Sequence, residues 1–134
     1  MQKDYRHATI SLSGHSYKAI LADTPSKRAI GLMFRRSIGS SECMLFIFPR
    51  ERRYGIWMHN MLFPIDILWL DSDMRVVDMK ENAKRCALFD CVTYTPKRAA
   101  KYVLEFNAGT IEKARIKLGT KAATRFSQKW KKEK

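Results

Sequence analysis

Three side chains suited to ligand recognition lie in one apolar stretch at the centre of the sequence, residues 54–71 (YGIWMHNMLFPIDILWLD). Trp57 offers an aromatic face, Asn60 an amide that donates and accepts hydrogen bonds, and Asp66 a carboxylate. This combination is typical of a pocket for a small polar molecule. We therefore expect a sugar- or nucleoside-like ligand to bind at Trp57, Asn60 and Asp66.

Asp66 also has a structural interpretation. It lies in the apolar run Ile65–Leu70, which is too short for a core helix and reads as a strand buried on both faces. On such a strand Asp66 shares a face with Leu68 and Leu70. An ionised carboxylate there needs hydrogen-bond donors or a cation. Asp66 is thus either a pocket floor or a structural residue, held by backbone N–H groups of residues 57–63 or by an arginine.

The sequence gives little support for nucleophilic or metal chemistry. A nucleophilic cysteine needs a histidine base beside it, and no spacing in the sequence brings the two residue types together. Cys86 and Cys91 are separated by four residues with no histidine near them, so we expect no metal and no cofactor. A small hydrolase-like enzyme remains an alternative. Its candidate residues are Cys43, Cys86, Cys91, His7, His15 and His59.

The charge balance points to acidic partners. Twenty-six Lys and Arg against thirteen Asp and Glu give a net charge of +13. A strongly basic protein attracts nucleic acid and other polyanions. The segment 120–134 is a basic tail, which serves either as a solubilising end or as a nucleic-acid contact. In the second case the contacts would come from Arg125, Lys129, Trp130, Lys131 and Lys132.

Apolar runs and turn residues predict a mainly β fold, an antiparallel β-sandwich or barrel-like single domain with two short helices. Residues 1–119 form this domain. The strand Lys101–Phe106 reads as half exposed, with Lys101 and Glu105 on its outer face. The other expected strands are Thr9–Leu12, Tyr17–Ala22, Cys43–Phe48 (ended by Pro49), Gly55–Met58, Ile65–Leu70 and Met74–Glu81, joined by turns and a long loop, Asn82–Lys101.

The two helices are marked by their ends. Thr24 and Pro25 begin the first helix as its N-cap and first residue, and we expect it to end near Phe34–Arg36. Thr110 caps the second, Ile111–Lys117.

The first twenty residues lack the apolar core of a signal peptide, and no stretch is long and apolar enough for a membrane span. We expect a cytoplasmic protein whose three cysteines stay free, although Cys86 and Cys91 are close enough to pair. The oligomeric state does not follow from the sequence.

Several linked motifs resemble the family known as domain of unknown function 192, over roughly Ala22 to Gly119. The resemblance implies a compact β-sandwich-like domain of no established activity, exported in many bacterial members and cytoplasmic in archaeal-type members without a signal. The family offers no catalytic residue to carry over, but its C-x-x-Y motif adds Cys91 and Tyr94 to the candidate ligand-binding residues. The matching segments are T-P-x-x-R-x-x-G-L-M-F (24–34), M-L-F-x-F (44–48), W-M-x-N-x-x-x-P-x-D-I (57–67), C-x-x-Y (91–94), A-K-Y-V-L-E (100–105) and A-G-T (108–110).

Overall fold

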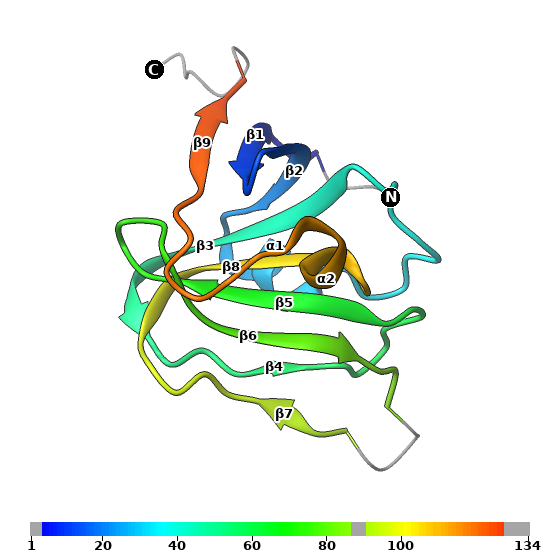
Figure 1. The fold of residues 1–134 in the computed structure, drawn as a ribbon. Helices are drawn as coiled ribbons and strands as arrows, with labels where there is room; N and C mark the ends of the chain where they lie inside the picture. Colours follow the sequence, from blue (N-terminus) through cyan, green and yellow to red (C-terminus); the bar gives the residue numbers. More distant parts are fainter. Residues whose placement is uncertain (1–3, 87–90, 128–134) are drawn as a thin grey trace.

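The computed structural model describes residues 4–86 and 91–127 and confirms the mainly β fold with two short helices (Figure 1). The elements in chain order are β1 His7–Leu12, β2 His15–Ala22, α1 Pro25–Ile30, β3 Glu42–Arg52, β4 Ile56–Trp57, β5 Ile65–Leu70, β6 Val76–Ala83, β7 Thr93–Tyr94, β8 Ala100–Asn107, α2 Thr110–Ala114 and β9 Ala123–Phe126.

One large sheet organises the molecule. Its seven strands run in the order β6-β5-β8-β3-β2-β1-β9, while β4 and β7 form a separate two-stranded sheet. Neighbouring strands are antiparallel except β2 and β3, which are parallel. The described strands form no closed barrel. The predominantly antiparallel pairing expected from the sequence is therefore correct, with one parallel pair at the centre.

The large sheet is covered on both faces at β5, which has no exposed residue. Leu68 and Leu70 point into a first core, which is covered by Ile111 and Ala114 of α2. Ile65, Ile67 and Trp69 of the same strand point into a second core on the opposite face. The segment after α1 and the β4–β7 sheet cover this second face, and the two helices lie on opposite sides of the sheet (Figure 1).

The parallel pair β2–β3 requires a crossover connection, and α1 begins that connection. As expected, Thr24 is its N-cap, and the Thr24 side chain accepts a hydrogen bond from the backbone N–H of Lys27 at 3.2 Å. The predicted end near Phe34–Arg36 is wrong. The helix ends at Ile30 because Gly31 adopts φ 52°, a backbone conformation outside the helical region.

The second helix also differs from its prediction at both ends. Its N-cap is Gly109, and the Thr110 hydroxyl donates instead to the carbonyl of Asn107 at 2.8 Å. The helix ends at Ala114 rather than Lys117, because Arg115 takes a left-handed conformation with φ 57°.

Two strand predictions need correction. Strand β3 continues through Pro49 to Arg52, and its pairing with β8 shifts register between Ile47 and Arg52, an irregularity that accommodates a proline. The predicted strand Gly55–Met58 is reduced to β4, which pairs with β7 inside the presumed long loop Asn82–Lys101. The two strands of the central stretch therefore have different partners, β7 for β4 and β6 and β8 for β5.

The C-terminal segment belongs to the sheet, which corrects the boundary drawn at residue 120. Strand β9 pairs with β1, and the buried Ala122 donates a backbone hydrogen bond to Met74 at 2.9 Å. The residue that precedes β6 in sequence, Arg75, also bridges to Lys121. The domain thus extends at least to Phe126, while residues 128–134 of the predicted tail lie outside the described residues.

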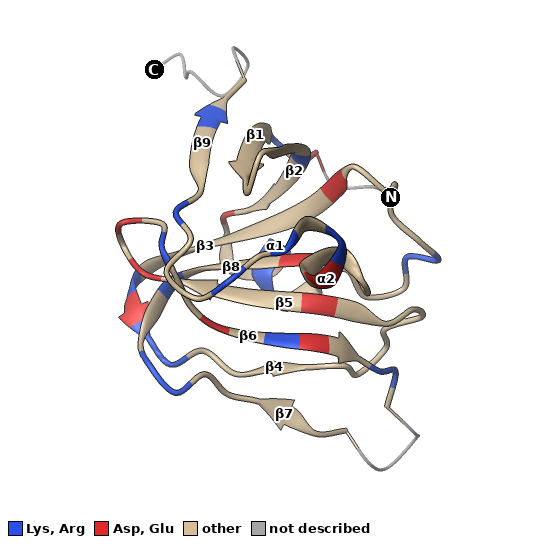
Figure 2. Cartoon of the chain, viewed as in Figure 1, with Lys and Arg blue, Asp and Glu red and all other residues tan. Residues whose placement is uncertain are grey.

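Basic side chains are spread over the molecule. Figure 2 shows Lys and Arg on β9, α1 and β6 and on the connections next to β4 and β7, rather than on a single element. The positive charge noted in the sequence therefore does not follow one strand or one helix.

Candidate functional site

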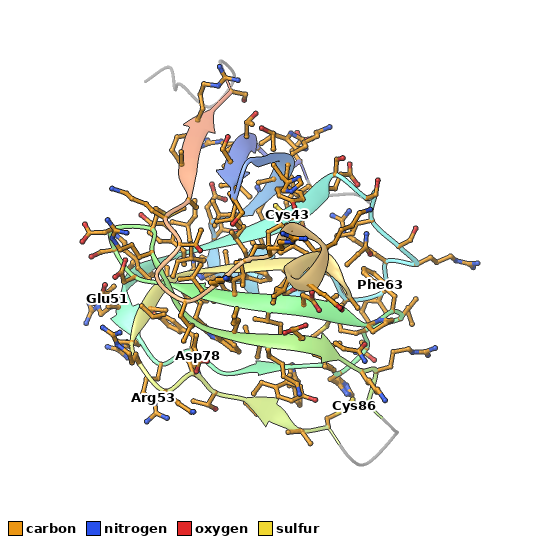
Figure 3. The ribbon with its side chains drawn as sticks, in the orientation of Figure 1. Cys43, Glu51, Arg53, Phe63, Asp78 and Cys86 are labelled. Atoms are coloured by element: carbon orange, nitrogen blue, oxygen red, sulfur yellow. A yellow bond between two sulfur atoms is a disulfide. The ribbon has the colours of Figure 1, made fainter. Side chains whose placement is uncertain are left out.

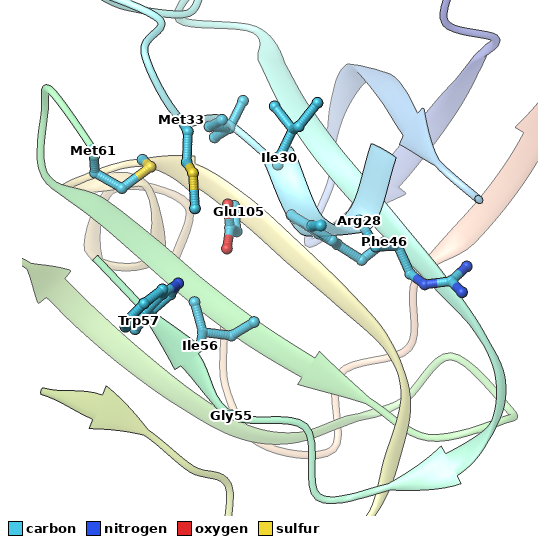
Figure 4. Close-up of a pocket in the computed structure, with 12 residues that line it drawn as sticks. Arg28, Ile30, Met33, Phe46, Gly55, Ile56, Trp57, Met61 and Glu105 are labelled. Carbon is cyan, nitrogen blue, oxygen red and sulfur yellow. The ribbon is translucent and has the colours of Figure 1, made fainter. Parts of the chain in front are cut away.

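A small cavity of about 190 Å³ opens on the second face of the sheet, between the segment that follows α1 and strand β4 (Figure 4). Its floor is the large sheet, from which Phe46 of β3 and Glu105 of β8 face the cavity. Most of its wall is apolar. The lining residues are Arg28, Ala29, Ile30, Gly31, Leu32, Met33, Phe46, Gly55, Ile56, Trp57, Met61 and Glu105.

Glu105 is the only carboxylate among the residues that line this cavity. Its neighbours across the sheet are Met44 of β3 and Ile67 of β5, both part of the second core. The side chain is 4% exposed, and no hydrogen bond or ion pair from the described part of the chain involves its carboxyl group. Burial disfavours the charged form and raises the pKa of Glu105 to about 8. The carboxyl is therefore largely protonated at neutral pH and offers both a donor and an acceptor to the cavity.

Glu105 was expected on an exposed face, and that prediction is wrong. The alternation of Tyr102, Leu104 and Phe106 predicts a half-exposed strand with these three residues on its buried face. In the structure β8 is central, between β3 and β5, so both of its faces are covered. Val103, which lies on the same face as Glu105, was the signal in the sequence that this face is apolar as well.

Trp57 stands at the mouth of the cavity, with 49% of its surface exposed (Figure 4). Its position depends on the pairing of β4 with β7, in which Trp57 lies opposite Thr93. Gly55 permits this close pairing, because a Cβ at that position would lie 2.6 Å from the side-chain methyl group of Thr93. An aromatic ring at the edge of a cavity is a platform on which a flat or ring-shaped ligand can stack.

The opposite wall is built by α1 and the turn after it. A Cβ on Gly31 would lie 3.1 Å from the ring of Phe46, so glycine lets this turn approach the sheet closely. Arg28 donates to the carbonyl of Ile47 at 2.9 Å, and its guanidinium lies 5.2 Å from the ring centroid of Phe48. These contacts hold the Arg28 guanidinium on β3, which explains why it does not neutralise Glu105.

Asp66 has a structural position away from the cavity. It is fully buried, and its carboxylate accepts backbone hydrogen bonds from Asn82, Gly109 and Ile111 at 2.8, 3.1 and 2.8 Å. These donors replace the predicted ones, residues 57–63 or an arginine. Asp66 does not line the cavity. The carboxylate ties β6 and the start of α2 to β5, so the structural interpretation describes it and the pocket-floor interpretation does not.

Asn60 supports the cavity wall without lining it. Its backbone has φ 62°, and its carbonyl accepts a hydrogen bond from the N–H of Phe34 at 2.9 Å. Its side-chain amide lies 4.0 Å from the sulfur of Met33, which is a lining residue. Asn60 thus joins the loop after β4 to the turn after α1.

Cys91 and Tyr94 do not line the cavity. Tyr94 pairs with Ile56, and the ammonium of Lys80 lies 5.1 Å from its ring centroid. Cys91 forms a disulfide with Cys86, so the expectation of three free thiols is wrong for these two, whereas Cys43 is free and buried. Figure 3 shows Cys86 far from Cys43, beyond the end of β6.

The structure brings a histidine to this disulfide. The Nδ1 of His59 lies 3.8 Å from the Sγ of Cys91, although the two residues are 32 positions apart in sequence. Sequence spacing could not reveal this contact, because it depends on the pairing of β4 with β7. A cysteine beside a histidine is also the pair that a hydrolase-like nucleophile requires. Here, however, the Sγ of Cys91 is bonded to Cys86 in a disulfide and cannot act as a nucleophile.

Of the nucleic-acid candidates, only Arg125 lies within the described residues, on the exposed surface of β9. Lys129, Trp130, Lys131 and Lys132 lie outside them. Of the five predicted ligand-binding residues, Trp57 alone lines the cavity.

The comparisons with known proteins identify the family. The DUF192 family model, described as "Uncharacterized ACR", matches residues 8–124. The chain belongs to the DUF192 family. This confirms the resemblance drawn from the motifs and extends it to β1 and β9.

Relatives named UPF0127 are similar to this chain. A UPF0127 protein of Thermococcus kodakarensis is 40% identical over 104 residues, which cover 76% of this chain and 61% of the relative. The chain thus spans less than two thirds of that relative. A UPF0127 protein of Pyrococcus abyssi is 36% identical over 106 residues, covering 78% of this chain and 83% of the relative.

Two crystal structures share the fold. One, from Sinorhizobium meliloti 1021 and described as a candidate transcription regulator, has a TM-score of 0.83 and 31% identity and covers 92% of this chain and 98% of its own. The other is a protein of unknown function from Novosphingobium aromaticivorans, with a TM-score of 0.78 and 31% identity. The match covers 89% of this chain and 84% of that protein's chain. Neither helix of the DUF192 domain is long and apolar enough to cross a membrane, and the described ranges contain no other helix.

Proposed function

We propose that this protein binds a small ring-shaped polar molecule, sugar- or nucleoside-like, in the cavity between α1 and β4. The observation that carries the proposal is Glu105, a buried carboxyl group that faces the cavity and has no hydrogen bond or ion pair from the described part of the chain. Burying such a group without a partner is unfavourable. A ligand hydroxyl, amine or ring N–H would supply the missing hydrogen bond.

The other walls suit the same kind of ligand. Trp57 offers an exposed aromatic face at the mouth, while Met33 and Met61 can adapt their flexible side chains to an irregular shape. Sites for drug-sized molecules usually have volumes of roughly 300–1,000 Å³. At about 190 Å³ the cavity is smaller, which favours a single ring such as one sugar or one nucleobase.

A shallower groove of about 600 Å³ adjoins the cavity and shares Arg28, Phe46 and Ile56 with it. Arg50 and Arg52 also line the groove, which places cationic side chains next to the mouth. Guanidinium groups recognise phosphate and carboxylate. A ligand that carries an acidic substituent would therefore gain a second contact here.

A thermal-shift screen tests the proposal, since a ligand that binds only the folded state raises its melting temperature. The panel contains monosaccharides, nucleobases and nucleosides, each also in phosphorylated form where one exists. We expect at least one compound to raise the melting temperature in a dose-dependent way. At a concentration of 100 times its Kd, the stabilisation is about 2.7 kcal/mol.

Variants locate the binding. Trp57→Ala removes the aromatic face, and Glu105→Leu removes the donor and acceptor of the buried carboxyl group; each should abolish or strongly reduce the shift produced by the active compound. Phe34→Ala is the matched control, because Phe34 is an exposed aromatic residue near the same turn that does not line the cavity. The proposal fails if no compound shifts the melting temperature, or if a compound still binds after both cavity substitutions.

A second candidate function is association with nucleic acid. The net charge of +13 supports it, as does the description of the Sinorhizobium meliloti neighbour as a candidate transcription regulator. Fluorescence anisotropy with labelled oligonucleotides should then show affinity that falls steeply with salt, because phosphate contacts release counterions. Affinity that does not change with salt would count against it.

The expected cytoplasmic location also stays a proposal. The Cys86–Cys91 disulfide bears on it, because disulfides are uncommon in reducing compartments. Alkylation of free thiols in freshly lysed cells would decide the point. If the alkylating reagent modifies Cys86 and Cys91, both are reduced in the cell, which indicates a reducing location.

A further inference from the structure

Three potential metal ligands meet at the edge of the β4–β7 sheet. The ligand atoms of His59, Cys86 and Cys91 all lie within 4.8 Å of one another, and all three residues are half buried. Two of them are joined as a disulfide in the structure. We propose that reduction of this disulfide creates a Cys₂His site that binds Zn²⁺ or a similar thiophilic divalent cation.

The distances favour a metal centre. Zinc bonds of about 2.3 Å to sulfur and 2.0–2.1 Å to nitrogen, at tetrahedral angles, place a sulfur and a nitrogen ligand about 3.6 Å apart. The Cys91 Sγ and the His59 Nδ1 are 3.8 Å apart, so little movement is needed. The two sulfurs, once no longer bonded to each other, must separate to about 3.8 Å, which rotation about the side-chain bonds can provide.

Secondary structure holds the three ligands in place. His59 comes two residues after the end of β4, and Cys91 two residues before the start of β7, and these strands pair with each other. Cys86 follows β6, whose last residue, Ala83, pairs with Ile65 of β5. The ring of Trp57 lies 4.8 Å from that of His59 and limits its movement.

The chemistry balances with a reductant of the dithiol class. Two electrons and two protons from the dithiol break the Cys86–Cys91 bond and give two thiols, while the dithiol itself becomes a disulfide. The cation then binds both sulfurs and the neutral imidazole of His59, and the two thiol protons are released to water. Three protein ligands leave a fourth position for water or another small molecule, as in catalytic zinc sites.

The metal site and the proposed ligand cavity are separate inferences. Neither cysteine nor His59 lines the cavity, and Glu105 is not among the three clustered metal ligands. Trp57 contacts both, because it lines the cavity and lies against His59. Failure of one proposal therefore leaves the other in place.

Cobalt titration of the full chain tests the site. The protein is reduced with a phosphine under anaerobic conditions, and Co²⁺ is added while visible absorption is recorded. We expect one Co²⁺ per reduced chain, with the visible d–d absorption of tetrahedral cobalt bound to thiolates, and displacement by Zn²⁺. The oxidised chain should bind none at the same concentrations.

Substitutions assign the ligands. Cys86→Ser, Cys91→Ser and His59→Ala should each weaken Co²⁺ binding about tenfold or more and change the absorption spectrum. The matched controls are Cys43→Ala and His15→Ala, which should bind like the wild type, because Cys43 is buried in β3 and His15 lies in β2. Circular dichroism confirms that each variant is folded, and His59→Ala leaves the disulfide-forming cysteines untouched.

Two results would overturn the proposal. One is a reduced, folded wild-type chain that binds no Co²⁺ or Zn²⁺. The other is binding that persists in the His59→Ala variant with an unchanged spectrum, since the cation would then be held elsewhere.

Discussion

The carboxylate of Asp66 accepts a hydrogen bond of 2.8 Å from the backbone N–H of Ile111, in the first turn of α2. The same carboxylate accepts a hydrogen bond from the backbone N–H of Gly109, the N-cap residue. Glycine has no side chain with which to cap the helix itself. A residue from β5 thus performs the capping that the helix's own sequence does not provide.

Asp66→Ala should destabilise the protein by about 3 kcal/mol, because it leaves three backbone N–H groups without their acceptor, and that of Ile111 is buried. Ligand binding in the cavity should change little, since Asp66 does not line it. Urea unfolding measures the loss. Asp73→Ala, at an exposed turn position, is the control and should stay within about 0.5 kcal/mol of the wild type. Equal stability of the two variants would refute the capping role.

Glu105 should make stability depend on pH. Its pKa rises from an ordinary value of 4.5 to about 8 on burial, so the folded state holds a proton that the unfolded state has lost. Stability should therefore fall as the pH rises from 4.5 to about 8, by at most about 1.4 kcal/mol per pH unit.

Glu105→Gln isolates this effect, because a neutral amide of similar shape cannot ionise. The variant and the wild type should have similar unfolding free energies near pH 4, and the variant should be the more stable of the two at pH 8. Subtracting the two pH profiles removes the contributions of all other groups. A difference that does not vary with pH would show that Glu105 is ionised in the folded protein.

Gly55→Ala should displace Trp57. The added Cβ would lie 2.6 Å from the Thr93 methyl group, so β4 and β7 must move apart, at a cost of about 1–3 kcal/mol. Weaker ligand binding should accompany the loss of stability. The double variant Gly55→Ala with Thr93→Ser removes that methyl group and should recover both properties. No recovery in the double variant would mean that the clash is not the cause.

Ending the chain after Gly119 should destabilise it by about 2–4 kcal/mol, since the cut removes the pairing of β9 with β1 and the burial of Ala122. Ending it after Ser127 keeps every contact described for β9 and serves as the control. Thermal unfolding of both shortened chains provides the measurement. If both retain wild-type stability, β9 is not part of the cooperative fold.

Local sequence patterns predicted those features that depend on neighbouring residues. The apolar run Ile65–Leu70 indicated a strand covered on both faces, and Thr24 with Pro25 indicated the start of α1, as the structure confirms. The need of Asp66 for donors also followed from its apolar surroundings, but the donors themselves come from β6 and α2, whose positions no local pattern specifies.

The candidate site was less predictable for the same reason. Glu105 looked exposed because alternation along one strand cannot show whether a second layer covers the outer face. The approach of His59 to Cys91 depends on the pairing of two short strands that are far apart in sequence. Such contacts arise from the fold rather than from spacing along the chain.

The position of β9 also has a consequence for the order of folding. In the register of the sheet Ala8 lies opposite Phe126, so the two strands at opposite ends of the described chain must meet. The hairpin of β1 and β2 can form as soon as both have left the ribosome, because hairpins are local and fast. The pairing of β1 with β9 cannot form until almost the whole domain has been synthesised. Closure of this edge is thus a late, non-local event, and the rate of folding should be limited by such long-range pairings.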